Sequence, residues 1–435
     1  MRARECALRL LLEYEASGKY ANLSLSSHAL DSVPADERGF VTSLFYTAVE
    51  HKLTYDYYIA AFAKRSADKL SEHTKNVLRL GICQLVDMKN IPDFAAVNET
   101  VKLSKNPGER AFVNGVLRAV SSAEELPLPP REKNAARYLS VKYSVPVPTV
   151  KHFISMLGED GTEALLKKFN ETAPLTLTVN TLKISVEDFI KKLGDFGYTA
   201  TRAEFSDISV RLPGSHDPRK LPGFSEGEFF VQDEASALAA ALAVKDGTGR
   251  IADVCSAPGG KSFAMAILTG GRTEIDSFDI HESKMSLIES GAVRLGLNCI
   301  TASVRDARVP DPERLGCYGT VLCDAPCSGL GVIAKKPDLR YKDISALSAL
   351  PTLQYEILSA SAGYASPGGA LVYSTCTLND AENRDVVEKF LSENPCFEAE
   401  DFTLGELKSE GGMLTLYPHL HNTDGFFIAK LRKNK

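Results

Sequence analysis

The sequence predicts a multidomain fold, with an all-α N-terminal domain, a small α+β middle domain and an α/β C-terminal domain. Up to about residue 126, apolar residues recur at three- and four-residue spacings, which is typical of helices. Residues 173–183 then alternate apolar and polar side chains, as in a strand. After about residue 225, strand-like and helix-like segments alternate, which indicates an open and largely parallel sheet.

The N-terminal domain is predicted over residues 1–128. Its clearest helical patterns lie in residues 38–65 and 75–90, and a breaker cluster of Pro127, Pro129 and Pro130 follows them. No strand-like alternation of useful length occurs before this cluster. We therefore expect helices alone in this part of the chain.

Residues 129–225 are interpreted as a helical linker followed by the small α+β domain. The strand expected in 173–183 is followed by a helical pattern over 185–197. This helix would begin at a serine cap and end at Gly197, as helix termini commonly do.

The C-terminal domain is predicted over residues 226–435. Its candidate strands are residues 250–254, 274–280, 319–324 and 369–375, and its candidate helices are residues 262–270, 283–296, 350–365 and 380–393. In such sheets, ligands bind beyond the carboxyl ends of the strands. Residues at those ends are therefore the candidates for function.

The composition excludes several classes of protein. With 44% hydrophobic and 24% charged residues, the chain is typical of soluble globular proteins, and no apolar run approaches the roughly 20 residues of a membrane helix. Glu5, Glu13 and Glu15 interrupt the only segment that could resemble a signal peptide, so we expect a cytoplasmic protein. The net charge of -6 gives no global sign of nucleic-acid binding.

The nine cysteines do not indicate a metal site or a disulfide framework. None of them forms a CxxC pair, and six of the nine fall between residues 255 and 376. We therefore expect no metal, and we look for reactive thiols in the C-terminal domain.

A glycine-containing turn follows the first strand of the sheet and opens a helix. Residues 255–262 (CSAPGGKS) would present backbone N–H groups and a helix N-terminus to a ligand. They differ from a Walker A loop only at Cys255, where GxxxxGK[ST] has glycine, and Asp324 ends a strand like a Walker B aspartate. A P-loop NTPase is therefore a rival interpretation, although the missing glycine counts against it. A turn with no ligand is the third possibility.

Two aspartates follow the next strands. Asp279 ends the second strand, where nucleotide-binding folds hold a ribose, although a helix N-cap is an equally good interpretation. Asp306 lies in SVRDARVP, after a third strand that precedes the fourth strand at residues 319–324, and it is informative only together with other candidate ligand residues. His281 is interpreted as a solvated loop residue.

Two cysteines follow the fourth and fifth strands. Cys327 lies in Asp324–Gly329 and Cys376 lies in Tyr373–Thr377. Carboxyl ends of adjacent strands would bring them to one crevice, although buried structural cysteine is the usual alternative for either alone. A thiolate can add to an electron-poor ring. A triad hydrolase is disfavoured, because the chain has no GxSxG elbow.

Together these motifs resemble the RNA 5-methylcytosine methyltransferases, specifically the bacterial small-subunit rRNA branch called Sun or Fmu (RsmB-like). The resemblance covers nearly the whole chain. It rests on DVCSAPGGKS, LCDAPCSGLGVIAKKPDLR, YSTCTLNDAENRDVVEKFL, DGFFIAKL and FVQDEASALAA, while ERAFVNGVLRAV and the helices before it resemble a NusB-like domain. The resemblance implies a Rossmann-like class I methyltransferase domain behind a NusB-like RNA-binding domain.

The resemblance also implies S-adenosylmethionine as cofactor. The residues that would wrap its methionine and ribose are Cys255, Ser256, Ala257, Pro258, Gly259, Gly260 and Lys261. Asp279 would take the ribose hydroxyls, Asp306 would lie beside the adenine, and Asp324 would lie between the cofactor and the target base.

By the same resemblance, Cys376 is the nucleophile that adds to C6 of cytosine, and Asp324 hydrogen-bonds or protonates N3. Cys327 would assist loss of the C5 proton and release of the product. The target base must leave its stack, so the implied partner is an unpaired cytosine in small-subunit (16S) rRNA. Basic residues near Cys327 fit RNA contact or a solvated turn equally well: Lys335, Lys336, Arg340 and Lys342.

Two alternatives to rRNA methylation remain. The catalytic motifs fit a tRNA cytosine-C5 methyltransferase equally well, and the NusB-like region favours rRNA by resemblance only. A non-catalytic RNA-binding or antitermination factor is the other alternative, which the intact cysteines, Asp324 and the glycine turn disfavour. We expect a monomer.

Overall fold

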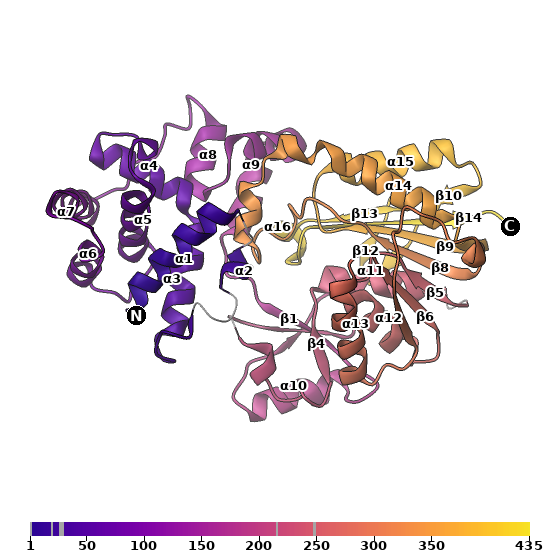
Figure 1. The fold of residues 1–435 in the computed structure, drawn as a ribbon. Coiled ribbons are helices and arrows are strands. Elements are labelled where there is room, and N and C mark those ends of the chain that lie inside the picture. The colour runs from indigo at the N-terminus through magenta and orange to yellow at the C-terminus, as the bar shows by residue number, and fades with distance from the viewer. Residues whose placement is uncertain (1, 19–20, 26–29, 215, 247–248) are drawn as a thin grey trace. The chain divides into compact units, whose positions relative to one another are not determined.

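The computed structural model describes residues 2–18, 21–25, 30–214, 216–246 and 249–435. The chain forms two compact units. One comprises residues 1–170 and 335–344, and the other comprises residues 171–334 and 345–435. Figure 1 shows helices and no strands from α1 to α9 and a large sheet in the orange-to-yellow later part of the chain. The division into three domains at residues 128 and 225 stays a prediction.

The described residues of the first unit form helices and connecting loops but no strands, as the apolar periodicity predicts. Its helices are α1 (Ala3–Ser17), α2 (Ala21–Ser24), α3 (Arg38–Glu50), α4 (Lys52–Ala63), α5 (Glu72–Val86), α6 (Asp93–Val101), α7 (Pro107–Ser121), α8 (Ala135–Tyr143) and α9 (Val147–Phe169). Helix α5 lies at the centre and packs against α1, α3, α4, α6 and α7. Its Arg79 is 4% exposed and forms ion pairs with Glu15 and Asp56.

The segment after the Cys327 loop returns to this helical unit. Its 3₁₀ helix η5 (Pro337–Tyr341) places Arg340, which is 0% exposed, among buried polar partners. The guanidinium donates to Asn170 Oδ1 at 2.8 Å and to the Tyr143 carbonyl at 3.2 Å, and it pairs with Glu50 at 3.2 Å. A buried guanidinium needs such partners to offset its lost hydration.

Arg340 therefore contradicts both interpretations made from the sequence, because it is neither an exposed RNA contact nor part of a solvated turn. Lys335 and Lys336 are exposed, whereas Lys342 is half-buried. Lys342 lines a cavity of about 860 Å³ in the helical unit, together with Tyr14, Lys52 and Tyr341.

The second unit begins with a small antiparallel sheet. Its strands are β1 (Leu175–Val179), β2 (Thr201–Arg202), β3 (Ser209–Leu212) and β4 (Phe229–Val231), in the order β2-β3-β1-β4. Helix α10 (Val186–Asp195) packs its Phe189 and Leu193 into the core of this sheet. Ser185 caps the helix by accepting from the Asp188 N–H at 3.1 Å, as its sequence predicts.

The large sheet carries the predicted strands. Its described strands are β5 (Ile251–Asp253), β6 (Ile275–Asp279), β7 (Ile300–Val304), β8 (Tyr318–Asp324), β9 (Ala365–Thr375), β10 (Phe397–Ala399), β13 (Met413–Leu416) and β14 (Phe426–Lys433). Their order is β10-β14-β9-β8-β5-β6-β7, with β13 beside β14. Strands β5 to β9 pair in parallel, and β14 joins β9 antiparallel. A separate ribbon pairs β11 (Thr403–Leu404) with β12 (Leu407–Lys408).

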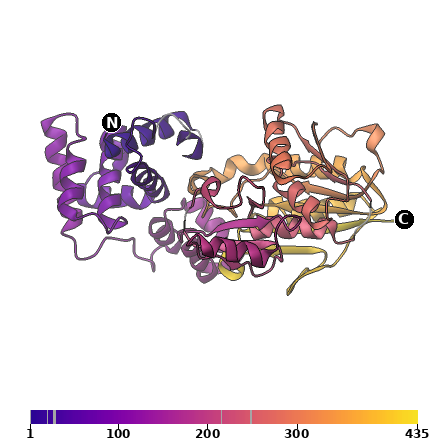
Figure 2. The same cartoon turned by 90° about the horizontal axis from the view of Figure 1, so that it is seen from below.

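Helices cover both faces of this sheet, as Figures 1 and 2 show. Helices α11 (Glu234–Val244), α12 (Gly260–Leu268) and α13 (Glu282–Leu295) share a core on one face. On the other face lie α14 (Leu350–Ala362) and α15 (Arg384–Glu393). The short helix α16 (Pro418–His421) precedes β14. In the described part of the chain, no helix is long and apolar enough to cross a bilayer.

We predict that Arg340→Ala destabilises the helical unit by about 3 kcal/mol, because it leaves buried acceptors without their donor. Thermal and urea unfolding of the full chain, followed by circular dichroism, measures this loss. The matched control is Arg137→Ala, because Arg137 is an exposed residue of the same unit. Equal stability of the two variants would contradict the proposed role of Arg340.

Candidate active site

The carboxyl ends of β8 and β9 bring two thiols together. In the parallel pairing of these strands, Asp324 lies opposite Ser374. The Sγ atoms of Cys327 and Cys376, which follow the two strands, are 3.2 Å apart. Their proximity was expected from the strand order, although 49 residues separate them in sequence. The site thus contains two sulfur atoms in direct contact at the edge where parallel sheets bind ligands.

A close approach of two glycines fixes the loop that follows Cys327. The N–H of Gly331 donates to the Cys376 carbonyl at 3.0 Å, and the N–H of Gly425 donates to the Gly331 carbonyl at 2.8 Å. A Cβ on Gly331 would lie 1.8 Å from the Gly425 carbonyl oxygen. Only glycine fits at position 331. Its lack of a side chain allows the backbone of this loop to contact the Cys376 loop and Gly425.

The glycine turn joins β5 to α12. The N–H and hydroxyl of Ser256 donate to the Phe278 carbonyl at 2.8 and 3.0 Å, which ties the turn to β6. Gly259 precedes α12 with φ +108°, and a Cβ there would lie 2.5 Å from the Phe263 ring. Glycine is therefore required, and the first amides of α12 point to the carboxyl edge of the sheet.

Lys261, in the first turn of α12, is bound to the aspartate that ends β8. Its Nζ lies 2.6 Å from Asp324 Oδ2, and the Lys261 side chain is 12% exposed. Burial works against the lysine charge, but the nearby Asp324 carboxylate raises the pKa of Lys261 above its ordinary value. Ser374 donates to the other oxygen, Asp324 Oδ1, at 2.8 Å. The sequence identified both residues but gave no sign that they form a pair.

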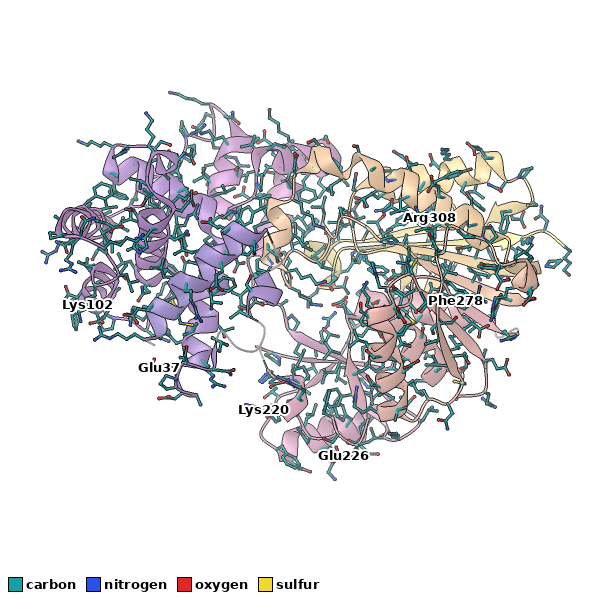
Figure 3. All side chains as sticks on the ribbon, viewed as in Figure 1. Glu37, Lys102, Lys220, Glu226, Phe278 and Arg308 are labelled. Atoms are coloured by element: carbon teal, nitrogen blue, oxygen red, sulfur yellow. The ribbon has the colours of Figure 1, made fainter. Side chains whose placement is uncertain are left out.

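Asp279 and Asp306 differ in their surroundings. Asp279 is 8% exposed, and it accepts from the N–H of Ala257 at 3.2 Å and from the N–H of His281 at 3.0 Å. It therefore links the glycine turn to the start of α13. Asp306 pairs with Arg308, which is labelled in Figure 3, at 2.6 Å. This ion pair lowers the pKa of Asp306. His281 precedes α13.

Asp253 at the end of β5 was missed as a candidate in the sequence. It is 0% exposed, and the Ser262 hydroxyl donates to its Oδ2 at 2.6 Å. Its Oδ1 is buried without a hydrogen-bond partner. Burial raises the pKa of Asp253 to about 7, and the Ser262 hydrogen bond only partly opposes this shift. A buried aspartate within a strand pattern gives no signal that distinguishes it from an ordinary strand-end residue.

Further observations describe the surroundings of the site. Within the ranges that the structure describes, no group of three or more His, Cys, Asp or Glu side chains could hold a metal ion. Lys261, which would reach toward phosphates in a Walker A loop, is paired with Asp324 instead. Cys323, one residue before Asp324, is fully buried in the core, and burial raises the pKa of its thiol well above the ordinary range.

We predict that Asp253→Asn reduces the pH dependence of stability between about pH 4 and pH 7. The folded pKa of Asp253 lies near 7, above the ordinary 3.8, so the folded state keeps this proton when the unfolded chain has lost it. The stabilisation is therefore complete below pH 4 and is lost as the pH rises through 7. Urea unfolding at several pH values measures the effect. The exposed Asp195 provides the control Asp195→Asn, and parallel pH profiles for all three proteins would refute this prediction.

Three family models match consecutive parts of the chain. The 16S rRNA methyltransferase RsmB/F model matches residues 239–432, and the NusB family model matches residues 1–122. A ferredoxin-like domain of RsmF/B-like methyltransferases matches residues 148–217. These matches agree with the predicted order of a NusB-like domain, a small α+β domain and a methyltransferase domain.

Two relatives and one solved structure align with nearly the whole chain. The probable ribosomal RNA small subunit methyltransferase B of Bacillus subtilis is 33% identical over 99% of this chain and 98% of its own. A protein of the same name from Synechocystis is 34% identical over 99% of both chains. The crystal structure of PH0851 aligns with a TM-score of 0.78 and 26% identity, over 99% of both chains. The chain therefore belongs to the RsmB/F family of 16S rRNA methyltransferases, enzymes that use S-adenosylmethionine as cofactor.

Proposed function

We propose that this protein methylates C5 of a cytosine in small-subunit (16S) rRNA through a covalent bond between Cys376 and C6 of the base. The observation that carries the proposal is the 3.2 Å contact between the Cys327 and Cys376 Sγ atoms at the ends of adjacent strands. One thiol is enough for nucleophilic attack on the ring. A second thiol within contact distance supports a reaction that must also dismantle its covalent intermediate.

The residues around the glycine turn fit S-adenosylmethionine. We assign residues 255–261 to its methionine and ribose, Asp279 to the ribose hydroxyls and Asp306 to the adenine side. The buried Asp253 Oδ1, which has no hydrogen-bond partner, leaves one acceptor beside this turn for a ligand donor. When bound, the cofactor supplies an electrophilic methyl group that the activated C5 of the base accepts.

Cys376 is assigned as the nucleophile. Cytosine C5 is too poor a nucleophile to react alone, so the Cys376 thiolate first forms an S–C6 bond and makes C5 enamine-like. The charge of Lys261 interacts with Cys376, which favours a thiolate there. Asp324 is assigned to hydrogen-bond or protonate N3 of the base, which draws electron density from the adduct.

Cys327 is assigned to the end of the reaction. After C5 has gained its methyl group, it must lose its proton, and the electrons of that C–H bond then expel the Cys376 thiolate as the S–C6 bond breaks. The contact between its sulfur and that of Cys376 supports this assignment. The two cysteines thus have separate roles, one in forming the adduct and one in resolving it.

The choice of 16S rRNA rests on the NusB-like region and on the names of the relatives. Because the catalytic residues would catalyse the same reaction on an accessible cytosine in any RNA, tRNA is the second candidate substrate. A cytosine in a loop or another unpaired segment is the expected form of the substrate, since the base must reach the edge of the sheet.

We predict that labelled S-adenosylmethionine yields 5-methylcytosine in deproteinised small-subunit rRNA. Cys376→Ala should lower turnover by more than roughly 10³-fold, because it removes the nucleophile. Cys327→Ala should instead accumulate a denaturant-resistant RNA adduct, because addition proceeds and resolution fails. Scintillation counting, nucleoside mass spectrometry and denaturing gels measure these outcomes.

Cys396→Ala is the matched control, because Cys396 is exposed and precedes β10, which pairs with the Lys433 end of β14, whereas the opposite end of β14 pairs with Thr375 beside Cys376. It should retain wild-type turnover and form no stable adduct. Label on tRNA but not on rRNA would overturn the target and leave the chemistry intact. RNA binding without label on either RNA would favour the non-catalytic factor.

A further inference from the structure

The buried carboxylate of Glu382 connects the two cysteine loops. Glu382, in the 3₁₀ helix η7 (Asp380–Glu382), is 0% exposed. Within the described residues, no Lys, Arg or His forms an ion pair with it. Its oxygens instead accept from the Ser328 N–H at 2.8 Å, from Gln354 Nε2 at 3.0 Å and from Asn379 Nδ2 at 3.0 Å. A buried charge held only by neutral donors is costly, which indicates a specific role.

These hydrogen bonds join the two loops. Ser328 directly follows Cys327, and Glu382 belongs to the segment that follows Cys376. Gln354 extends the connection, because its Nε2 also donates to the Pro326 carbonyl at 2.9 Å. The hydroxyls of Ser328 and Thr377 hydrogen-bond each other at 2.7 Å. One carboxylate therefore fixes the residues on both sides of Cys327 to the loop of Cys376.

The two thiols experience different charges. The hydrogen bond to Cys376 and burial raise the pKa of the Cys327 thiol, and the negative charges of Glu382 and Asp324 raise it further. Tyr373 also interacts with Cys327, and burial raises the pKa of Tyr373. The Lys261 ammonium also interacts with Cys376. Two thiols in contact cannot both ionise easily, so these surroundings decide which thiol loses its proton first.

We propose that Glu382 is a positioning residue that holds the Cys327 and Cys376 loops together and, through its negative charge, makes Cys376 the thiol that ionises. This inference rests on the proposed function only in taking the Cys376 thiolate to be the group that attacks C6 of the base. The geometry and the order of ionisation belong to the protein alone. They can therefore be measured without RNA or cofactor.

Pulsed alkylation with iodoacetamide tests the order of ionisation directly, because only the thiolate reacts. Peptide mass spectrometry after short pulses gives the rates at Cys376 and Cys327 separately. In the wild type we expect faster alkylation of Cys376 around pH 7. In Glu382→Gln, which keeps the shape but removes the charge, the ratio of the two rates should fall by roughly three- to tenfold, since a change of one in pKa alters the thiolate fraction about tenfold.

Glu388→Gln is the matched control, because Glu388 is an exposed glutamate on the next helix. It should leave the ratio of alkylation rates unchanged. Glu382→Gln should also lower kcat for methyl transfer with little change in S-adenosylmethionine binding, and Glu382→Asp, which restores the charge, should recover part of the alkylation ratio.

Two results would overturn the proposal. One is faster alkylation of Cys327 than of Cys376 in the wild-type protein, a measurement that needs no variant. The other is a folded Glu382→Gln protein with an unchanged alkylation ratio. Failure of the proposed function is a separate outcome, because wild-type protein that methylates neither rRNA nor tRNA would still give interpretable alkylation rates.

Discussion

Parallel pairing of β8 with β9 is the interaction on which the site depends. It places Asp324 opposite Ser374 and starts both cysteine loops from one edge of the sheet. Contacts beyond the strands also join the two cysteine loops to each other. The Gly331 N–H binds the Cys376 carbonyl, and Gly331 itself is so close to Gly425 that no side chain fits. Backbone pairing thus creates the contact between two thiols that are distant in sequence.

Three carboxylates near the carboxyl ends of the strands are each held differently: Asp324, Glu382 and Asp253. Asp324 has a cation, Lys261, and a hydroxyl donor, Ser374. Glu382 has only neutral donors, among them the Ser328 N–H. Asp253 has one hydroxyl donor and an oxygen with no partner, and burial raises its pKa to about 7. These three carboxylates, alike in chemistry, therefore lie in different electrostatic surroundings.

Local patterns predicted most of the elements because they follow from side-chain periodicity. The strands ending at Asp253, Asp279, Asp324 and Thr375 lie where alternation and buried runs placed them. The proximity of Cys327 and Cys376 could be predicted because the carboxyl ends of adjacent parallel strands lie at the same edge of the sheet, where ligands bind. The motif resemblance supplied the cofactor, which no spacing in the sequence would have identified.

Contacts between distant segments could not be predicted in this way. Arg340 is a charged residue of the type usually found at the surface, but its partners Glu50, at the end of α3, and Asn170, directly after α9, are 290 and 170 residues away in sequence. Glu382 stands in a polar stretch that resembles an ordinary helix start, and its partner Ser328 is 54 residues away. Whether a charged residue is buried depends on such partners, and periodicity carries no information about them.

The most direct test of the Cys376 assignment is to map the covalent adduct formed on RNA containing 5-fluorocytosine. With fluorine at C5, methylation leaves no proton to remove, so the S–C6 bond persists in the wild-type protein with both cysteines intact. Peptide mass spectrometry of the trapped complex identifies the attached residue. We expect a methylated 5-fluorocytidine adduct on the peptide that contains Cys376. An adduct on the peptide that contains Cys327 would contradict the assignment and reverse the roles of the two thiols.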